Sequence, residues 1–416
     1  MTYVRNITDI DDKIIKKSIE EKKDFHEVAE TYTKAYFEVM EKLGVEKADI
    51  QPRATDCIQG MVELISGLIE KNHAYVVPST DLGKDVLFDS TSFKAYGKLS
   101  GKNLDELIEG ARVDKNETKK HPTDFVLWKA SKPGEPQWDS PWGKGRPGWH
   151  IECSAMVRKH LGDSIDVHGG GVDLTFPHHE NEIAQCEAFT QKPYVKYWLH
   201  NGFIEISGQK MSKSLGNIWK AKDALRDFRP EILRYFFLSA HYRSGLNYDR
   251  DILEACKRGW EEFNLTFQRV EEALNSPDGE GPLDLLELRL AIDEMEKKFR
   301  EAMDDDFNSP KAMAVLFDLA REARRVLSQS ARMTKGAKSL LAEVLEKLNQ
   351  FGGLLGIVST ERASVPPEVE ELAQTRVQLK KEKKFKEADE IRAKVLQLGF
   401  TIEDVQGGQF RILPKK

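Results

Sequence analysis

The chain has 416 residues, and at roughly 150 residues per domain this length predicts two or three domains. Charged residues make up 32% of the sequence and hydrophobic residues 40%, which is typical of a soluble globular protein and excludes collagenous and disordered classes. The 63 basic and 69 acidic side chains give a net charge of −6, so a nucleic-acid partner would have to be bound by local basic patches. Four cysteines and the lack of a long apolar run lead us to expect a cytoplasmic protein without a membrane partner.

The first half of the chain alternates between expected strands and helices. A loop rich in Pro and Gly covers residues 132–148, and a second loop follows at 207–216. The succession of strand, loop and helix predicts an α/β domain with a parallel sheet. Periodicity predicts helices over 13–22, 24–43, 54–71, 151–161 and after Pro177, and strands over 3–7, 73–77, 85–88, 164–167 and 198–206.

The second half of the chain is predicted to be mostly helical. Amphipathic patterns over residues 249–275, 283–303, 309–329 and 335–352 indicate a helix bundle. A linker marked by Pro follows at 364–368, and two more helices are expected within 367–397. Two short apolar segments joined through Gly407-Gly408 predict a terminal hairpin.

A dense group of metal-ligating residue types precedes residue 183. Cys153 follows Gly148-Trp-His-Ile-Glu, and His178 and Glu182 are four residues apart, so on a helix they share one face. Thiolate, imidazole and carboxylate together suit Zn²⁺ with one position left open. His179 competes with His178 for the ligand role, and spacing does not choose between them. The alternative is the polar start of a surface helix beside a buried cysteine.

A second candidate site is the loop Gly208-Gln-Lys210-Met-Ser212-Lys213-Ser214-Leu-Gly-Asn217. Two lysines and two serines on a glycine-bounded loop can follow a polyphosphate, with each lysine acting as a point charge. A solvated basic turn is the alternative, although the full string Lys-Met-Ser-Lys-Ser is more specific than a generic pair of lysines.

Several strings resemble one family closely and in chain order. The string Lys210-Met-Ser-Lys-Ser214 resembles the second signature of class I aminoacyl-tRNA synthetases, and the set as a whole resembles the cysteinyl-tRNA synthetases. The other strings are Asn6-Ile-Thr-Asp-Ile-Asp-Asp12, Arg146-Pro-Gly-Trp-His-Ile-Glu-Cys-Ser-Ala-Met156, His168-Gly-Gly-Gly171, residues 176–182, His241-Tyr-Arg-Ser244, Leu246-Asn-Tyr248 and Asp304-Asp-Asp-Phe-Asn308.

This resemblance implies an architecture and a reaction. We expect a Rossmann-type catalytic domain at residues 1–248, with a connective insertion at about 60–125. A helical tRNA-binding bundle at 249–363 and a small α+β anticodon-recognition segment at 364–416 would follow. Cysteine and ATP, with Mg²⁺, would form cysteinyl-adenylate, and the cysteine would pass to its tRNA. Members of the family are mostly monomeric.

The resemblance also implies roles for individual residues. Cys153, His178 and Glu182 would bind a zinc ion that selects the substrate thiolate, which favours His178 over His179. Trp149, His150 and His168 would line the amino acid pocket, Thr8 would lie near the substrate, and Asp173 would receive its ammonium group. Lys213 would be the main ATP contact, with Lys210, Ser212 and Ser214 on the same loop. For Trp149 and His150 the alternative is packing around a glycine turn.

The sequence departs from the family pattern at its start. It contains no His-Ile-Gly-His string, and the family's further cysteine ligand to zinc has no counterpart among Cys57, Cys186 and Cys256. We therefore expect a catalytic domain without its first strand and helix, weak zinc binding and poor cysteine activation. Two other functions stay open: a non-catalytic tRNA-binding relic, and a ligase that joins cysteine to a small amine.

The likeliest RNA-binding patch is residues 376–395. This segment contains eight Lys or Arg residues and four acids, a local excess of positive charge that could contact phosphates. A solvated helix with ion pairs four residues apart is the alternative. The family places an RNA-reading module in this region, which favours the first interpretation.

Overall fold

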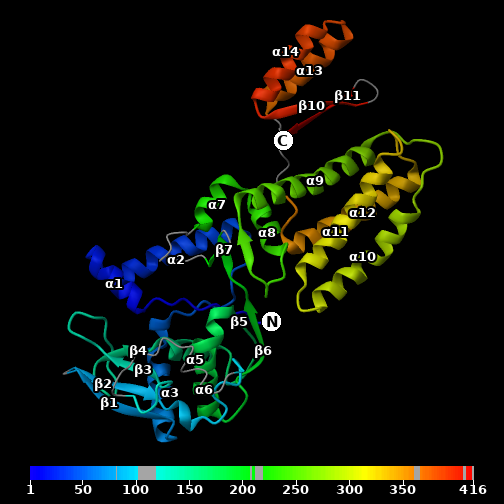
Figure 1. Cartoon of the computed structure of the whole chain (residues 1–416). Helices are drawn as coiled ribbons and strands as arrows, with labels where there is room; N and C mark the ends of the chain where they lie inside the picture. Colours follow the sequence, from blue (N-terminus) through cyan, green and yellow to red (C-terminus); the bar gives the residue numbers. More distant parts are fainter. Residues whose placement is uncertain are drawn as a thin grey trace. The chain divides into compact units, whose positions relative to one another are not determined.

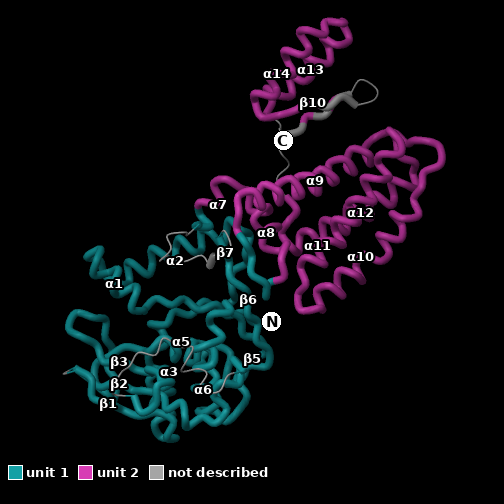
Figure 2. The backbone as a smooth tube through the Cα atoms, in the orientation of Figure 1, with its two compact units in different colours: residues 1–222, 242–247 teal, residues 223–241, 248–416 magenta. Residues whose placement is uncertain are grey.

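The computed structural model describes residues 1–80, 82–101, 119–206, 209–210, 219–359, 366–405 and 409–414. Two compact units divide the chain, one of residues 1–222 with 242–247 and one of residues 223–241 with 248–416 (Figure 2). In the part of the chain that the structure describes, no helix is long and apolar enough to cross a membrane.

The first unit begins with an extended segment and two capped helices. Helix α1 (Asp12–Glu21) starts at Asp11, whose carboxylate accepts a hydrogen bond from the Ile14 amide at 2.6 Å, and α2 (Phe25–Lys42) starts at Asp24. The strand predicted at 3–7 is reduced to two isolated parallel bridges, Val4 with Ile50 and Ile7 with Arg53. The partner segment contains Pro52, which has no amide hydrogen and cannot extend the ladder.

An antiparallel sheet forms the next part of this unit. Its strand order is β1-β2-β3-β4, with β1 at Ala74–Thr80, β2 at Gly83–Phe88, β3 at Phe125–Ala130 and β4 at Gly145–Pro147. Helix α3 (Ile58–Glu70) follows the short η1 helix (Ala54–Cys57) and belongs, with this sheet and α5, to one buried apolar core. The core contains Leu64, Leu68, Leu127 and Trp128, which explains why the central strand β3 reads as apolar without clear alternation.

The predicted parallel pairing is present further along the chain. Strands β5 (Ile165–Gly171) and β6 (Val195–Asn201) pair in parallel, with His168 opposite Trp198 and Gly170 opposite His200. Between them lie η3 (Val172–Leu174), η4 (Thr175–His179) and α6 (Glu180–Thr190), the kind of helical crossover that parallel strands need. Helix α5 (Trp149–His160) packs against α6 (Figure 1).

A smaller sheet has the strand order β8-β7-β9, made of β7 (Ile204–Ile206), β8 (Gln209–Lys210) and β9 (Leu246–Tyr248). Lys210 is the last residue of β8, and its backbone pairs with Glu205 of β7. Helices α7 (Ala221–Asp227) and α8 (Pro230–Leu238) follow in the chain.

The second unit contains the predicted helix bundle. Helices α9 (Arg250–Asn275), α10 (Leu286–Asp304), α11 (Ser309–Leu327) and α12 (Lys335–Leu355) contact one another (Figure 1). Their apolar faces form one core that includes Phe263, Phe299 and Phe351. Helix α12 ends at Gly356, whose φ of 68° suits glycine, and the preceding Leu355 carbonyl accepts a hydrogen bond from Arg234 at 3.0 Å.

The C-terminal segment has its own small core. Helices α13 (Pro367–Lys381) and α14 (Phe385–Gln397) precede the antiparallel pair β10 (Phe400–Val405) and β11 (Gln409–Pro414), so the predicted hairpin is confirmed. Val369, Ala373, Val395 and Ile402 are buried together. The segment is thus an α+β element, as the sequence predicts.

Candidate functional site

Helix α5 brings Cys153 toward α6. The helix starts directly after Gly148, where a Cβ atom would lie 2.1 Å from the Val126 carbonyl oxygen, so only glycine allows this close approach to β3. Burial raises the pKa of the Cys153 thiol well above its ordinary value, and the carboxylates of Glu182 and Glu152 raise it further. The thiol is therefore protonated unless a cation stabilises the thiolate.

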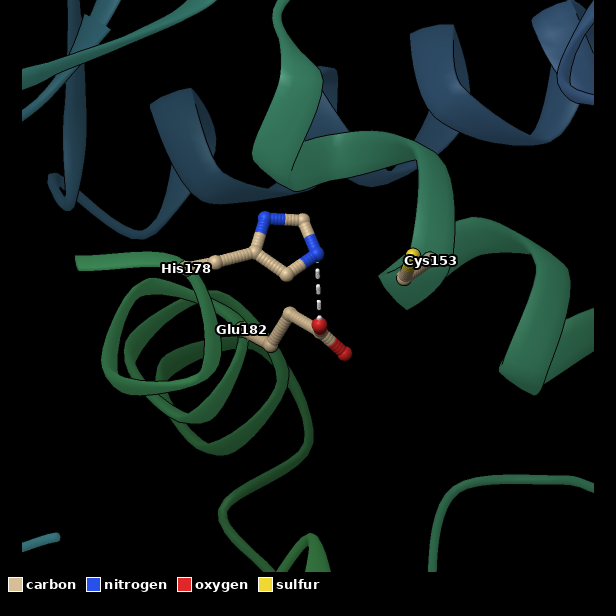
Figure 3. A group of neighbouring side chains, drawn as sticks. All are labelled: Cys153, His178 and Glu182. Atoms are coloured by element: carbon tan, nitrogen blue, oxygen red, sulfur yellow. Dashed lines mark ion pairs between the residues drawn. The ribbon is translucent and has the colours of Figure 1, made fainter. Parts of the chain in front are cut away.

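His178 and Glu182 meet at the start of α6, as their spacing predicts. The distance from His178 Nε2 to Glu182 Oε1 is 3.1 Å, and Figure 3 shows both side chains turned toward Cys153. Glu182 is fully buried, and apart from this approach of His178 Nε2 its Oε1 has no polar partner among the described residues. Burying a carboxylate oxygen with so few partners is costly, and a metal ion bound by it would offset that cost.

Cys153, His178 and Glu182 form a group whose ligand atoms all lie within 4.8 Å of one another. These three side chains would be the ligands of a metal ion bound here. Burial acts to raise the pKa of Glu182, but the neighbouring imidazoles, first His168 and then His178, outweigh it and lower the pKa to about 2. The carboxylate is thus ionised and available as a ligand.

His179 also lies against Glu182, so the geometry by itself leaves the choice between the two histidines open. A second group of ligand atoms within 4.8 Å consists of His168, His179 and Glu182. Burial lowers the pKa of His179 to about 3, which keeps its ring neutral. His179 Nδ1 is 2.8 Å from His200 Nε2, so one of these two nitrogens donates a hydrogen bond to the other.

Two of the residues predicted to line an amino acid pocket, Trp149 and His150, lie against His178. The Trp149 ring stacks on the His178 ring with centroids 4.3 Å apart, and 47% of Trp149 is exposed. His150 Nδ1 is 2.9 Å from His178 Nδ1, and burial lowers the pKa of His150 to about 3. An exposed aromatic face beside candidate metal ligands can receive a small substrate.

Two other predicted residues are placed differently. Asn6 donates hydrogen bonds to Thr8 Oγ1 at 3.5 Å and to Cys153 Sγ at 3.6 Å, so Thr8 is near the candidate ligands. Asp173 is exposed, and its carboxylate lies over Gly171, where an added Cβ would be 2.6 Å from Asp173 Oδ1. Among the described residues, no hydrogen bond or ion pair joins Asp173 to the candidate ligands, so its role stays a prediction.

The predicted nucleotide loop falls almost wholly outside the described residues. Ser212, Lys213 and Ser214 are not among them, and only the backbone of Lys210 is.

Three residues around the candidate ligands were not predicted as site residues: Asn6, Tyr194 and His200. Tyr194 donates a hydrogen bond to Glu182 Oε2 at 3.0 Å. The parallel pairing of β5 and β6 would have to be known to place Tyr194 and His200 there.

Comparisons with known proteins show the family to which this chain belongs. The family model described as "tRNA synthetases class I (C) catalytic domain" matches residues 1–258, and the "DALR domain" model matches residues 298–359. A protein named "Cysteine--tRNA ligase" from Halalkalibacterium halodurans is 47% identical over 98% of this chain and 85% of its own length. Another of that name from Clostridioides difficile is 45% identical over 98% of this chain and 86% of its own length.

The chain belongs to the cysteine--tRNA ligase family of class I aminoacyl-tRNA synthetases. The fold agrees with this membership. A solved structure of methionyl-tRNA synthetase from Mycobacterium tuberculosis, in complex with methionyl-adenylate, has a TM-score of 0.62 at 14% identity and covers 85% of this chain and 82% of its own. The prediction of a Rossmann-type class I synthetase domain followed by a helical domain is therefore confirmed.

Proposed function

We propose that this chain ligates cysteine to its tRNA with ATP, through a cysteinyl-adenylate. The observation that carries the proposal is the group of Cys153, His178 and Glu182, which lies beside the half-exposed ring of Trp149. The two relatives described above are named for this reaction. A cytoplasmic location and a monomeric state belong to the same proposal as expectations.

The donor set fits a zinc ion. One thiolate, one imidazole and one carboxylate are ligands that zinc accepts, and the buried Glu182 Oε1 atom, which has only His178 Nε2 beside it, supports a cation at this place. Three protein ligands leave a position for the sulfur of a cysteine substrate. Zinc, when bound, would supply a Lewis acid that prefers a thiolate to a hydroxyl group, and this preference would separate cysteine from serine.

The remaining residues of the chain would bind and orient the substrates. The Trp149 and His150 rings would form one side of the amino acid pocket, with Thr8 and His168 near it and Asp173 as the candidate partner of the ammonium group. The lysines at 210 and 213, with Ser212 and Ser214, would contact the phosphates of ATP, which carries Mg²⁺. Fixed positive charge at a polyphosphate stabilises the charge that develops as pyrophosphate leaves.

The C-terminal segment would contribute to tRNA binding. Exposed cations lie at the end of α13, in the turn that follows and on α14: Lys381, Lys383, Lys386, Arg392 and Lys394. Arg376 is buried and cannot be part of a surface patch. Lys384 forms an ion pair with Glu382 at 2.9 Å. The solvated-helix interpretation thus accounts for part of the segment, and the other exposed cations would be available to phosphates.

We also propose that these 416 residues activate cysteine poorly, because the sequence contains no His-Ile-Gly-His string. Cysteine-dependent exchange of pyrophosphate into ATP tests both parts of the proposal on the purified chain. The expected result is weak exchange with cysteine that serine does not support and that Cys153→Ser abolishes, with Cys256→Ser as the control. Exchange that does not discriminate cysteine from serine would contradict the proposal.

Two other functions make different predictions in the same assay. A non-catalytic tRNA-binding relic would bind tRNA and show no exchange at any enzyme concentration. A ligase for a small amine would show exchange with cysteine, but transfer would need an amine and not tRNA. The presence of the C-terminal segment with its exposed cations favours tRNA as the acceptor.

A further inference from the structure

We propose that Arg269 and Arg324 form a binding site for a phosphate group on the helix bundle, with Thr266 holding Arg324 in position. Thr266 and Arg269 lie on α9 and Arg324 lies on α11, and these two helices contact each other (Figure 1). Thr266 and Arg269 are three residues apart, so their side chains share one face of α9. The site lies within the second compact unit and shares no residue with the candidate metal ligands.

Arg269 is the residue that points to a ligand. Its side chain is partly buried, and its Nε atom is buried without a hydrogen-bond partner in the part of the chain that the structure describes. Within the same residues, no carboxylate forms an ion pair with it. A guanidinium group is always charged and has several N–H donors, so burying part of it without partners is costly. A bound oxyanion would supply both the acceptors and the opposite charge.

Further positive charge lies beside Arg269. Burial lowers the pKa of Arg324, and Glu262 acts to raise it. The guanidinium groups of Arg269 and Arg321 lower that pKa further, so all three arginines lie close together. The acids that pair with this group are already engaged, because Glu262 lies 3.3 Å from Arg324 Nη2 and Asp318 lies 2.7 Å from Arg321 Nη1. The charge of Arg269 therefore stays uncompensated among the described side chains.

Arg324 is held in a fixed position. Its Nη1 donates a hydrogen bond to the buried Thr266 hydroxyl at 2.7 Å, and only 20% of the Arg324 side chain is exposed. The Thr266 hydroxyl donates in turn to the Glu262 carbonyl oxygen at 3.3 Å. These contacts use some of the N–H donors of Arg324 and leave others for a ligand. A guanidinium that is already ordered loses little side-chain entropy when it binds an anion.

The chemistry of the pair favours phosphate over a single carboxylate. A guanidinium group matches the oxygens of a phosphate with two parallel hydrogen bonds, and two guanidinium groups match its larger charge. The phosphate could belong to an RNA backbone or be free inorganic phosphate. A backbone phosphate of the tRNA is the source that we favour, and this choice of source rests on the proposed function.

Binding of a cysteine tRNA transcript to the full-length chain tests the RNA source. If Arg269 neutralises one backbone phosphate, Arg269→Gln should weaken binding roughly eightfold at 0.1 M salt and make the slope of log K against log salt less steep by about 0.9. Arg269→Lys keeps the charge and should restore the slope. Arg300→Gln is the control, because it removes the same charge from an exposed, ion-paired position of α10 and should change neither quantity.

Thermal unfolding in sodium chloride and in sodium phosphate of equal ionic strength tests the free-phosphate source. In chloride, Arg269→Gln should not lower Tm, because it removes an uncompensated charge, whereas loss of a purely structural arginine would lower it. Phosphate stabilises many proteins by exclusion from their surface, so the readout is the difference between the variant and the unchanged chain. If free phosphate fills the site, the unchanged chain should gain more Tm than Arg269→Gln does.

The two measurements together decide the proposal. A change in tRNA binding identifies an RNA phosphate as the ligand, and a change confined to the phosphate-dependent Tm identifies free phosphate. The proposal would be overturned if Arg269→Gln altered neither, if Arg300→Gln had equal effects, or if Arg269→Gln lowered Tm in chloride. Neither measurement depends on cysteine activation, so failure of the proposed reaction would leave both results interpretable.

Discussion

At the scale of single residues, Glu182 is the carboxylate common to both ligand groups. It is fully buried and ionised, with imidazoles on two sides. Replacing it removes a candidate ligand and a charge, while the neighbouring imidazoles stay in place. The cost therefore falls mainly on metal affinity.

Glu182→Gln is expected to weaken zinc binding by at least about tenfold, by comparison with the cost of disturbing even a supporting hydrogen bond. Competition with a zinc chelator measures this. Glu63→Gln, at an exposed position of α3, is the matched control and should not change zinc affinity. Equal affinities for the Glu182 variant and the unchanged chain would show that Glu182 is not a ligand.

Gly170 offers a second residue-scale prediction. Because an added methyl group would overlap the His179 ring, Gly170→Ala should lower the free energy of unfolding by about 1–3 kcal/mol, the usual cost of overpacking. Gly169→Ala introduces the same atoms with ordinary contacts only. Urea denaturation of the two variants measures the difference, and equal stabilities would contradict the close approach of His179.

At the scale of secondary-structure elements, several helices begin at a residue whose side chain accepts a hydrogen bond from the first turn. Helix α12 begins at Thr334, whose hydroxyl accepts a hydrogen bond from the Ala337 amide at 3.3 Å. Thr334→Ala should lower the stability of the second unit by about 1 kcal/mol, a typical loss for an N-cap. Thr334→Ser keeps the hydroxyl and should retain most of the stability that alanine loses. Thermal unfolding of the two variants measures the difference. If alanine and serine behave alike, the cap does not contribute.

Some helices and strands could be predicted from the sequence, and others could not. The long amphipathic helices and the βαβ order follow from periodicity, because their apolar stripes are local patterns. Strand β3 was not predicted, since it is buried on both faces and lacks alternation, and β4 was read as part of a Pro/Gly loop. Glycine has low strand propensity, yet Gly169–Gly171 complete β5 because β6 pairs with them.

Some residues of the candidate site could be predicted from the sequence, and others could not. Cys153, His178 and Glu182 could be predicted because two of them share a helix face and the third is in a dense string of chemistry-bearing residues. Tyr194, His200 and Asn6 could not, because each reaches the site through tertiary contacts with a distant segment. Spacing left His178 and His179 tied, and the structure places both beside Glu182.

At the scale of the whole molecule, charge is the feature that bears on the RNA partner. The net charge is −6, so we expect tRNA binding to depend on local cations such as those between α13 and α14 and on α14. Changing Lys381, Lys383 and Lys386 together to Ala should weaken tRNA binding and make it less dependent on salt, because fewer counterions are released. Filter binding at two salt concentrations measures both effects.

The matched control changes three exposed lysines elsewhere, Lys13, Lys16 and Lys22, which alter the net charge equally. A similar loss of affinity in both triple variants would point to a general charge effect. No loss in either would support the solvated-helix interpretation of the C-terminal segment.

The proposal that Cys153, His178 and Glu182 bind an ion that recognises a thiolate can be tested by one titration. The chain is loaded with Co²⁺, and L-cysteine or L-serine is added while the thiolate charge-transfer band is followed. We predict that cysteine intensifies the band by adding a second sulfur ligand and that serine leaves it unchanged. Absence of any response to cysteine, or the same response in Cys153→Ser as in the unchanged chain, would contradict the account.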